Sequence, residues 1–160
     1  MKNTKSIFKN IFITIAFIPM LTSCGEIIRL ADFIGLIPPR EKEIHLSFGE
    51  QQVNEPFTLA DYCKEEYDTI FLLYSYFNTS KADFINLEMS PQLRRICESN
   101  VMLDTFNTLL FIKDGKVLAY CKVAYIDANF YSSEVEKHYI LPFHQKFMMD
   151  NERNIHIYNK

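Results

Sequence analysis

The stretch TLLFIKDGKVLAYCKVAY, residues 108–125, contains the clearest structural signal in this chain of 160 residues. An Asp-Gly pair at positions 114 and 115 separates two apolar runs. A two-residue hairpin turn needs positive φ at both central positions, and Asp and Gly tolerate it. Pairing outward from Lys113 and Lys116 therefore predicts an antiparallel hairpin. Its apolar side chains fall on both faces, which is typical of strands in the middle of a covered sheet.

This register assigns each side chain of the hairpin to one of two faces. The first face takes Leu110, Ile112, Val117, Ala119 and Cys121, and the second takes Leu109, Phe111, Leu118 and Tyr120.

Further strands are predicted on both sides of this hairpin. Residues 69–77 are apolar at alternate positions on both faces, which indicates another central strand. Residues 44–48 alternate and predict a short strand. Near the end, 145–149 and 154–158 flank a polar turn and predict a last hairpin.

Short helices are predicted between these strands. Thr58 precedes Asp61 by three residues and is typical of the N-cap of a brief helix over 57–66. Ser80 is the expected cap of a second helix, with Asp83 in its first turn. Ser90 and Pro91 predict a third, over 91–99, with Leu93, Ile96 and Cys97 buried. The expected class is α+β: a largely antiparallel sheet of five or six strands with two or three short helices.

The N-terminus has the composition of a secretory signal. Three lysines lie within the first nine residues, and an apolar run covers 11–21. A membrane-spanning helix needs about 20 apolar residues. This run is shorter and contains Pro19, so an exported and cleaved segment is favoured.

The end of that segment reads Leu21-Thr22-Ser23-Cys24 and resembles the lipobox of bacterial lipoproteins at all four positions. The resemblance implies transfer of a diacylglyceryl group to the Cys24 thiol, followed by cleavage after Ser23. It also implies that lipid on Cys24 anchors the protein to a membrane of the bacterial cell envelope, on the periplasmic or surface face. It covers about the first 25 residues.

Three regions follow from these signals: a signal peptide over 1–23, a tether over 24–43 and a single globular domain over 44–160. Apolar residues between Glu26 and Leu36 are interrupted by a charge at every third position, which predicts a short amphipathic helix. This helix either lies in the membrane interface beside the anchor or docks on its own domain.

Charge and motifs exclude several classes of function. Three of the 17 basic residues and none of the 20 acidic ones lie in 1–23, so the remainder carries a net charge of −6. Nucleic acid is therefore not an expected partner. The four histidines lack metal-binding spacing, and four glycines are too few for a dinucleotide fingerprint. No catalytic residue, metal or cofactor is predicted.

After lipidation of Cys24, an odd number of cysteines remains: Cys63, Cys97 and Cys121. None belongs to a Cys-x-x-Cys pair, and Cys97 and Cys121 fall on predicted buried faces. The sequence does not select the partners of any disulfide among the three.

Aromatic residues provide the only candidate binding surface. Five of them lie in a segment that the pattern predicts to be a connection between strands: Tyr125, Phe130, Tyr131, Tyr139 and Phe143. Tyr and Phe are favoured at the centres of protein interfaces. The leading interpretation is thus an envelope lipoprotein that binds another envelope protein, either an inhibitor or immunity-type protein or an accessory subunit. The alternative is a small hydrolase or ligand-binding lipoprotein, which a pocket joining Cys63 or Cys121 to a histidine would favour.

The anchor can be tested by substitution. Cys24→Ala removes the only thiol that the lipobox presents, so we expect it to abolish incorporation of labelled fatty acid into the protein. Persistent labelling of the variant would show that the lipobox interpretation is wrong.

Overall fold

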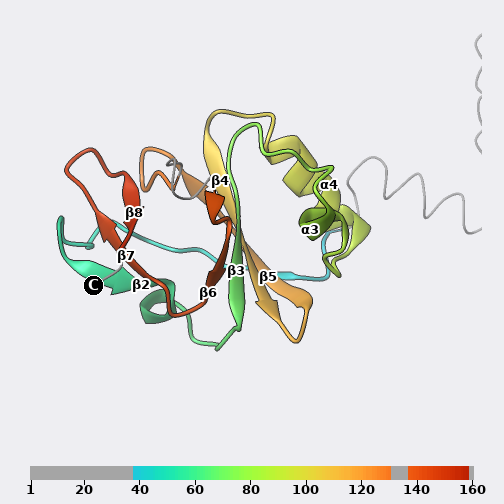
Figure 1. Ribbon diagram of the computed structural model, residues 1–160, viewed down its shortest axis with the longest axis horizontal. Coiled ribbons are helices and arrows are strands. Elements are labelled where there is room, and N and C mark those ends of the chain that lie inside the picture. Colours follow the sequence, from blue (N-terminus) through green and yellow to red (C-terminus); the bar gives the residue numbers. More distant parts are fainter. Residues whose placement is uncertain (1–37, 131–136, 159–160) are drawn as a thin grey trace, which may run out of the picture. The chain divides into compact units, whose positions relative to one another are not determined.

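The computed structural model of the chain describes residues 38–130 and 137–158 (Figure 1). All of these residues except Pro38 belong to the unit Pro39–Lys160. The signal peptide, Cys24, the amphipathic segment and Tyr131 lie outside the described residues.

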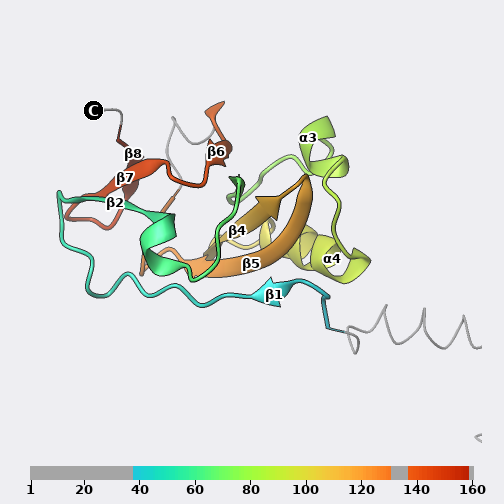
Figure 2. The same ribbon diagram turned by 90° about the horizontal axis from the view of Figure 1, so that it is seen from below.

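A five-stranded sheet forms the centre of this unit, in the order β1-β5-β4-β3-β6. The strands β4 and β5 pair over most of their length in an antiparallel hairpin, as the Asp-Gly turn predicted. β3 and β6 continue the sheet in antiparallel fashion, whereas β1 pairs with β5 in parallel (Figure 2). The bounds are β1 Lys42–Glu43, β3 Thr69–Leu73, β4 Phe106–Lys113, β5 Lys116–Ala124 and β6 Ile140–Pro142.

The turn of the hairpin has the predicted conformation. Asp114 and Gly115 both have positive φ, 50° and 75°, and Lys113 faces Lys116 across the ladder. The carboxylate of Asp68 accepts a hydrogen bond from the Asp114 backbone N–H at 2.7 Å. The turn is therefore also tied to the residue that precedes β3.

The predicted division of side chains between the two faces is wrong beyond the first pairs. Ile112 pairs with Val117, but Phe111 pairs with Ala119, which leaves Leu118 without a cross-strand partner. This β-bulge shifts the alternation of β5 by one residue. The residues that share a face are consequently Leu109, Phe111, Ala119 and Cys121, and on the other side Leu110 and Tyr120.

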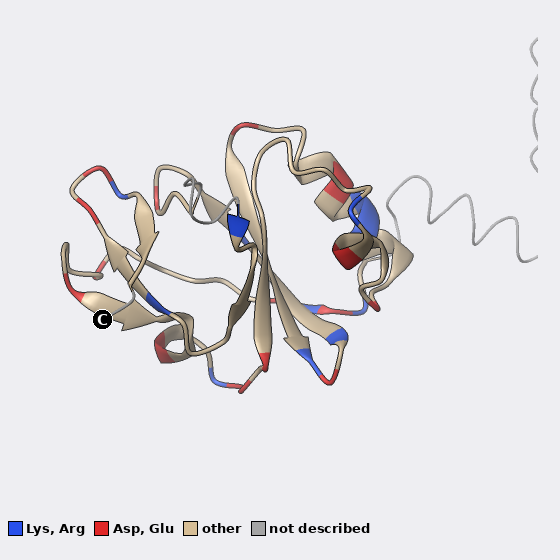
Figure 3. Ribbon diagram, in the orientation of Figure 1, with Lys and Arg blue, Asp and Glu red and all other residues tan. Residues whose placement is uncertain are grey.

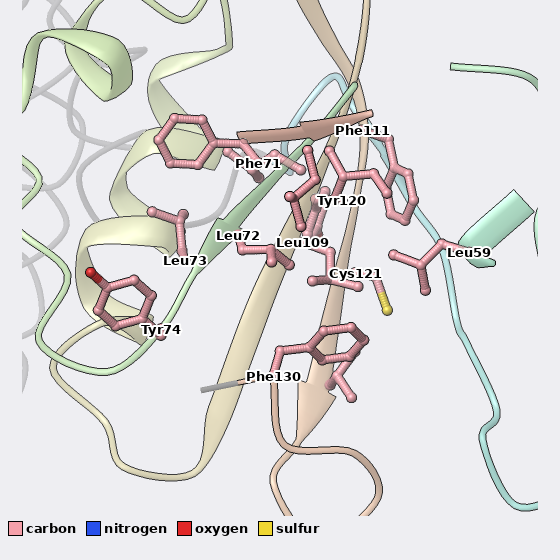
Figure 4. Packing of buried hydrophobic residues seen from close by; sticks show 14 of the residues in the cluster. Leu59, Phe71, Leu72, Leu73, Tyr74, Leu109, Phe111, Tyr120, Cys121 and Phe130 are labelled. Atoms are coloured by element: carbon pink, nitrogen blue, oxygen red, sulfur yellow. The ribbon is translucent and has the colours of Figure 1, made fainter. Parts of the chain in front are cut away.

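Each face of the sheet is covered by different elements. Phe71 and Leu73 point toward the side on which the helices lie, and the ring of Phe71 is 6.1 Å from that of Phe84 (Figure 4). On the opposite face, Phe111 points toward Leu59, and its ring centroid is 5.1 Å from that of Tyr67. The expected burial of the sheet on both sides is confirmed.

A second sheet of three antiparallel strands has the order β2-β7-β8. Its strands are β2 Pro56–Thr58, β7 Lys146–Met149 and β8 Ile155–Ile157. The predicted last hairpin is confirmed as β7 and β8. The α+β class is confirmed as well, with the strands distributed over two sheets. The predicted strand over 44–48 is wrong. The strand at this place is β1, and its pairing with β5 ends with the hydrogen bond from Ile44 N–H to the Tyr120 carbonyl.

The helical elements are η1 Leu59–Tyr62, α3 Ala82–Ile85 and α4 Pro91–Asn100. The cap of η1 is confirmed, because the Asp61 carboxylate accepts from Thr58 N–H at 2.7 Å, but η1 is a single 3-10 turn. α3 has Asp83 in its first turn, as expected. The prediction of Ser80 as its cap is wrong, since Lys81 occupies the N-cap position and makes no capping bond through its side chain.

The N-terminus of α4 is the best-defined helix end among the described residues. Ser90 is buried, and its hydroxyl accepts from Leu93 N–H at 3.2 Å, as the sequence predicted. The same hydroxyl donates to Glu41 at 2.6 Å, and Ser90 N–H donates to the other oxygen of that carboxylate at 2.5 Å. Ser90 therefore caps the helix and also holds the segment that leads into β1.

We expect Ser90→Ala to lower the free energy of unfolding by about 1–2 kcal/mol, because it removes both the cap and a bond to a carboxylate. Urea unfolding followed by circular dichroism measures the change. Ser99→Ala, an exposed position in the last turn of the same helix, serves as control and should change stability by less than about 0.5 kcal/mol. Equal effects of the two substitutions would contradict the capping role.

Candidate protein-binding surface

Three loops meet at one end of the five-stranded sheet (Figure 1). Because β4 is antiparallel to both β3 and β5, the chain leaves β3, enters β4 and leaves β5 at the same end. The loops are 74–78 after β3, 101–105 between α4 and β4, and 125–129 after β5. We call these residues together the loop cluster.

Tyr125 joins all three loops. Its backbone N–H donates to the Thr105 carbonyl at 3.1 Å. Its hydroxyl accepts from Ser75 N–H at 3.1 Å and is also hydrogen-bonded to the Ser75 hydroxyl. Ser75 in turn donates through its hydroxyl to the Leu103 carbonyl at 3.1 Å. These bonds fix the three loops relative to one another.

Tyr76 is the most unusual residue of the loop cluster. It is 69% exposed and has a φ of 60°, which costs a residue with a Cβ roughly 1–2 kcal/mol. Its N–H donates to the Val101 carbonyl at 2.7 Å, and its hydroxyl donates to Asp104 at 2.9 Å. The hydrogen bond to Asp104, together with the charge of that carboxylate, raises the pKa of the phenol. The ring is thus held in an exposed position by its neighbours.

Exposed apolar side chains concentrate in this cluster. The exposed fractions of Tyr76, Met102, Leu103 and Ile126 are 69%, 70%, 47% and 82%. They are four of the eight exposed large hydrophobic residues in the described part of the chain. Single exposed apolar residues are ordinary, but a concentration of them marks an interaction site.

The charge of the loop cluster is of one sign. Asp104 and Asp127 are exposed, and the three loops contain no Lys, Arg or His. In Figure 3, the loop at the top of the sheet accordingly has acidic but no basic colouring. The surface therefore combines apolar side chains with negative charge.

Of the four predicted aromatic residues that the structure describes, only Tyr125 belongs to this surface, where it is half-buried among the loops. Phe130 and Phe143 are 1% and 2% exposed, so they belong to the core rather than to a surface. Phe130 packs near Phe48, and Phe143 near Tyr67.

Tyr139 lies elsewhere, against α3. Its hydroxyl donates to Asp83 at 2.6 Å, and the ammonium group of Lys81 is 4.3 Å from the centre of its ring. These contacts tie the segment before β6 to α3. The fifth aromatic, Tyr131, lies outside the described residues.

The exposed residues of the loop cluster were missed by the sequence reasoning. Tyr76 lies within the predicted strand 69–77, but β3 ends at Leu73 and the chain turns at Tyr76 through its positive φ. Met102, Leu103 and Ile126 have no periodic pattern of their own. A signal for them emerges only when the topology brings their loops together.

A small pocket of about 260 Å³ does join Cys63 to a histidine, His45. Burial, and then the charge of Glu65, raise the pKa of the Cys63 thiol. No hydrogen bond links Cys63 to His45 in the part of the chain described. The predicted burial of Cys97 and Cys121 is confirmed, and all three cysteines are free thiols in this structure.

A second pocket, of about 490 Å³, lies between β6 and β8. Its lining includes Lys137, His138 and Gln145 beside apolar residues of both strands, and none of the described residues that line it is a cysteine or has a carboxylate. Over 38–130 and 137–158, no group of three or more His, Cys, Asp or Glu side chains is placed to hold a metal ion.

Within the described ranges, no helix is both long and apolar enough to cross a membrane. No protein-family model, no curated protein and no solved structure matches the chain.

Proposed function

We propose that this chain is a lipoprotein of the bacterial cell envelope, anchored through lipid on Cys24, that binds another protein through the loop cluster. The observation that carries the binding role is the concentration of exposed apolar side chains, Tyr76, Met102, Leu103 and Ile126, on loops that hydrogen bonds hold together.

The physical argument is preorganisation. Binding is weakened when loops must be ordered as the complex forms. Here Tyr125 and Ser75 already connect the loops, so little further ordering is needed. Tyr76 adds a large ring with few rotatable bonds, in a backbone conformation that costs stability and is typical of functional positions.

The size of the surface fits the centre of an interface rather than the whole of it. A stable interface buries about 800 Å² on each partner, which is more than four side chains supply. The partner must therefore also contact polar residues around the loop cluster. An inhibitor, an immunity-type protein or an accessory subunit of an envelope complex works in this way, by binding and without chemistry of its own.

Site-specific photocrosslinking in the native host tests this proposal. A photoreactive phenylalanine analogue replaces Met102 in the full-length protein, and an otherwise identical protein has it at Leu118. Both positions are exposed, 70% and 45%, but only Met102 belongs to the loop cluster. We expect Met102 to crosslink to one envelope protein in high yield and Leu118 not to do so. Equal yields, or no crosslink from Met102, would contradict the proposal.

Tyr76→Gly in the Met102 crosslinking protein separates binding from folding. Glycine removes the ring but accepts the positive φ, so we expect the free energy of unfolding to change by no more than about 1 kcal/mol. The crosslink should be lost nevertheless. Phe77→Ala, which truncates a neighbouring buried ring, shows for comparison the effect of a folding defect. We expect it to lower the free energy of unfolding by about 3–5 kcal/mol.

A second candidate function, as a hydrolase or ligand-binding protein, is favoured by one observation: the pocket that brings Cys63 and His45 together. A nucleophilic cysteine must reach the thiolate state, usually through a lowered pKa. The raised pKa of Cys63 opposes this role, because it keeps the thiol protonated at neutral pH. Protein binding is thus the better supported of the two functions.

Alkylation by iodoacetamide distinguishes these functions. Mass spectrometry of the peptide that contains Cys63 measures its rate of alkylation. We expect this rate to rise with pH through a midpoint above the ordinary pKa of a thiol. Glu65→Gln removes a charge that raises this pKa and should lower the midpoint. Glu66→Gln, at the adjacent exposed carboxylate, is the matched control and should leave it nearly unchanged. A midpoint below neutral pH would instead favour a catalytic thiol.

A further inference from the structure

We infer that the partner presents a cationic, apolar segment to the loop cluster, with at least one Lys or Arg beside its apolar anchor. This inference rests on the proposed protein-binding function. It adds the chemical character of the surface that the partner contributes.

The first argument is the negative charge of the loops. Asp104 and Asp127 are exposed and lie on two different loops, and the three loops contain no basic residue. A neutral or acidic partner would have to bury these carboxylates without offering an opposite charge, which is costly. A Lys or Arg side chain would instead pair with them.

The end of α4 adds to this negative charge. The helix ends at Asn100, immediately before loop 101–105, and the C-terminal end of a helix has partial negative charge. A basic residue in the last turn would offset it, but α4 has none there and has the exposed carboxylate of Glu98 instead. The charge at this end is therefore not balanced within the helix.

Two basic residues contact the loop cluster but make other bonds there. Arg153 donates to the main-chain carbonyls of Asp127 and Phe48, at 2.6 and 3.0 Å, rather than to a carboxylate. The ammonium group of Lys81 lies over the rings of Phe77 and Tyr139. Within 38–130 and 137–158, no salt bridge neutralises Asp104, Asp127 or Glu98.

Tyr76 and Asp104 form the most specific part of this site. The hydroxyl of Tyr76 donates to the Asp104 carboxylate, so the exposed ring and the charge lie next to each other. A Lys or Arg side chain can pack its methylene groups or guanidinium plane on such a ring while its charged end pairs with the carboxylate. The apolar residues Met102, Leu103 and Ile126 would then contact the neighbouring apolar anchor of the partner.

The test uses the photocrosslinking protein with the analogue at Met102, in the full-length chain and in native envelopes. Asp104→Asn combined with Asp127→Asn removes the charge, and Asp104→Lys combined with Asp127→Lys reverses it. We expect the crosslink yield to fall about tenfold with the neutral pair and further with the reversed pair. Glu66→Lys, which makes a charge reversal of the same kind before β3, is the control and should keep the yield.

The crosslinked peptide of the partner provides a second, independent result. We expect its sequence to contain Lys or Arg within a few residues of the crosslinked position. An unchanged yield with the neutral and reversed pairs, or a peptide with no basic residue, would overturn this inference while the binding function stands. Absence of any crosslink from the parent protein would overturn both. We expect circular dichroism to show that each variant retains the fold, since neither Asp104 nor Asp127 is buried.

Discussion

The pairing of β4 with β5 across the Asp114–Gly115 turn is the constraint on which the other elements depend. β3 and then β6 extend the sheet from β4, and β1 extends it from β5. The turn itself is tied to Asp68, which places the start of β3 beside it. Because this hairpin is apolar on both faces, it needs a cover on each side. Phe84 of α3 contributes to the cover of one face, and Leu59 of η1 and Tyr67 contribute to the cover of the other. The two covers meet the sheet through aromatic contacts such as Phe71 with Phe84 and Phe111 with Tyr67.

The same pairing decides where the loop cluster lies. Three loops that are far apart in sequence meet because the strands that end in them alternate in direction. Tyr125 then connects the loops through its backbone and its hydroxyl. The loops are short and hydrogen bonds connect them to one another, so exposed side chains on them have defined positions. This arrangement, a packed sheet with functional residues on the loops at one end, is a common way in which small domains present a binding surface.

The sequence predicted the elements with local signals and missed those that depend on tertiary contacts. The turn at Asp114, the cap at Ser90 and the last hairpin follow from neighbouring residues alone, and the structure confirms them. The bulge at Leu118 has no local signal, because the residue there is as apolar as its neighbours, and it reversed the predicted faces of β5. For the site, apolar character did not distinguish Phe130, which is buried, from Ile126, which is exposed. That difference depends on whether other segments of the folded chain pack over the side chain, which the local sequence does not reveal.

Exposure of four large apolar side chains on a rigid surface is the feature that stability does not account for. Fully burying one such side chain gives about 1.5–3 kcal/mol, and the isolated domain forgoes a part of this at each of these positions. Tyr76 adds the cost of its positive φ, which a glycine would avoid. A domain of this size has only about 5–15 kcal/mol of stability, so the burial energy left unused here is large in comparison. In the proposed complex, association that buries the cluster would gain this energy, and the acidic residues beside it would favour cationic partners. The same exposed apolar side chains leave burial energy unused in the free protein and would supply binding energy in the proposed complex. For this reason we assign the binding site to the loop cluster rather than to the pocket at Cys63 or the pocket between β6 and β8.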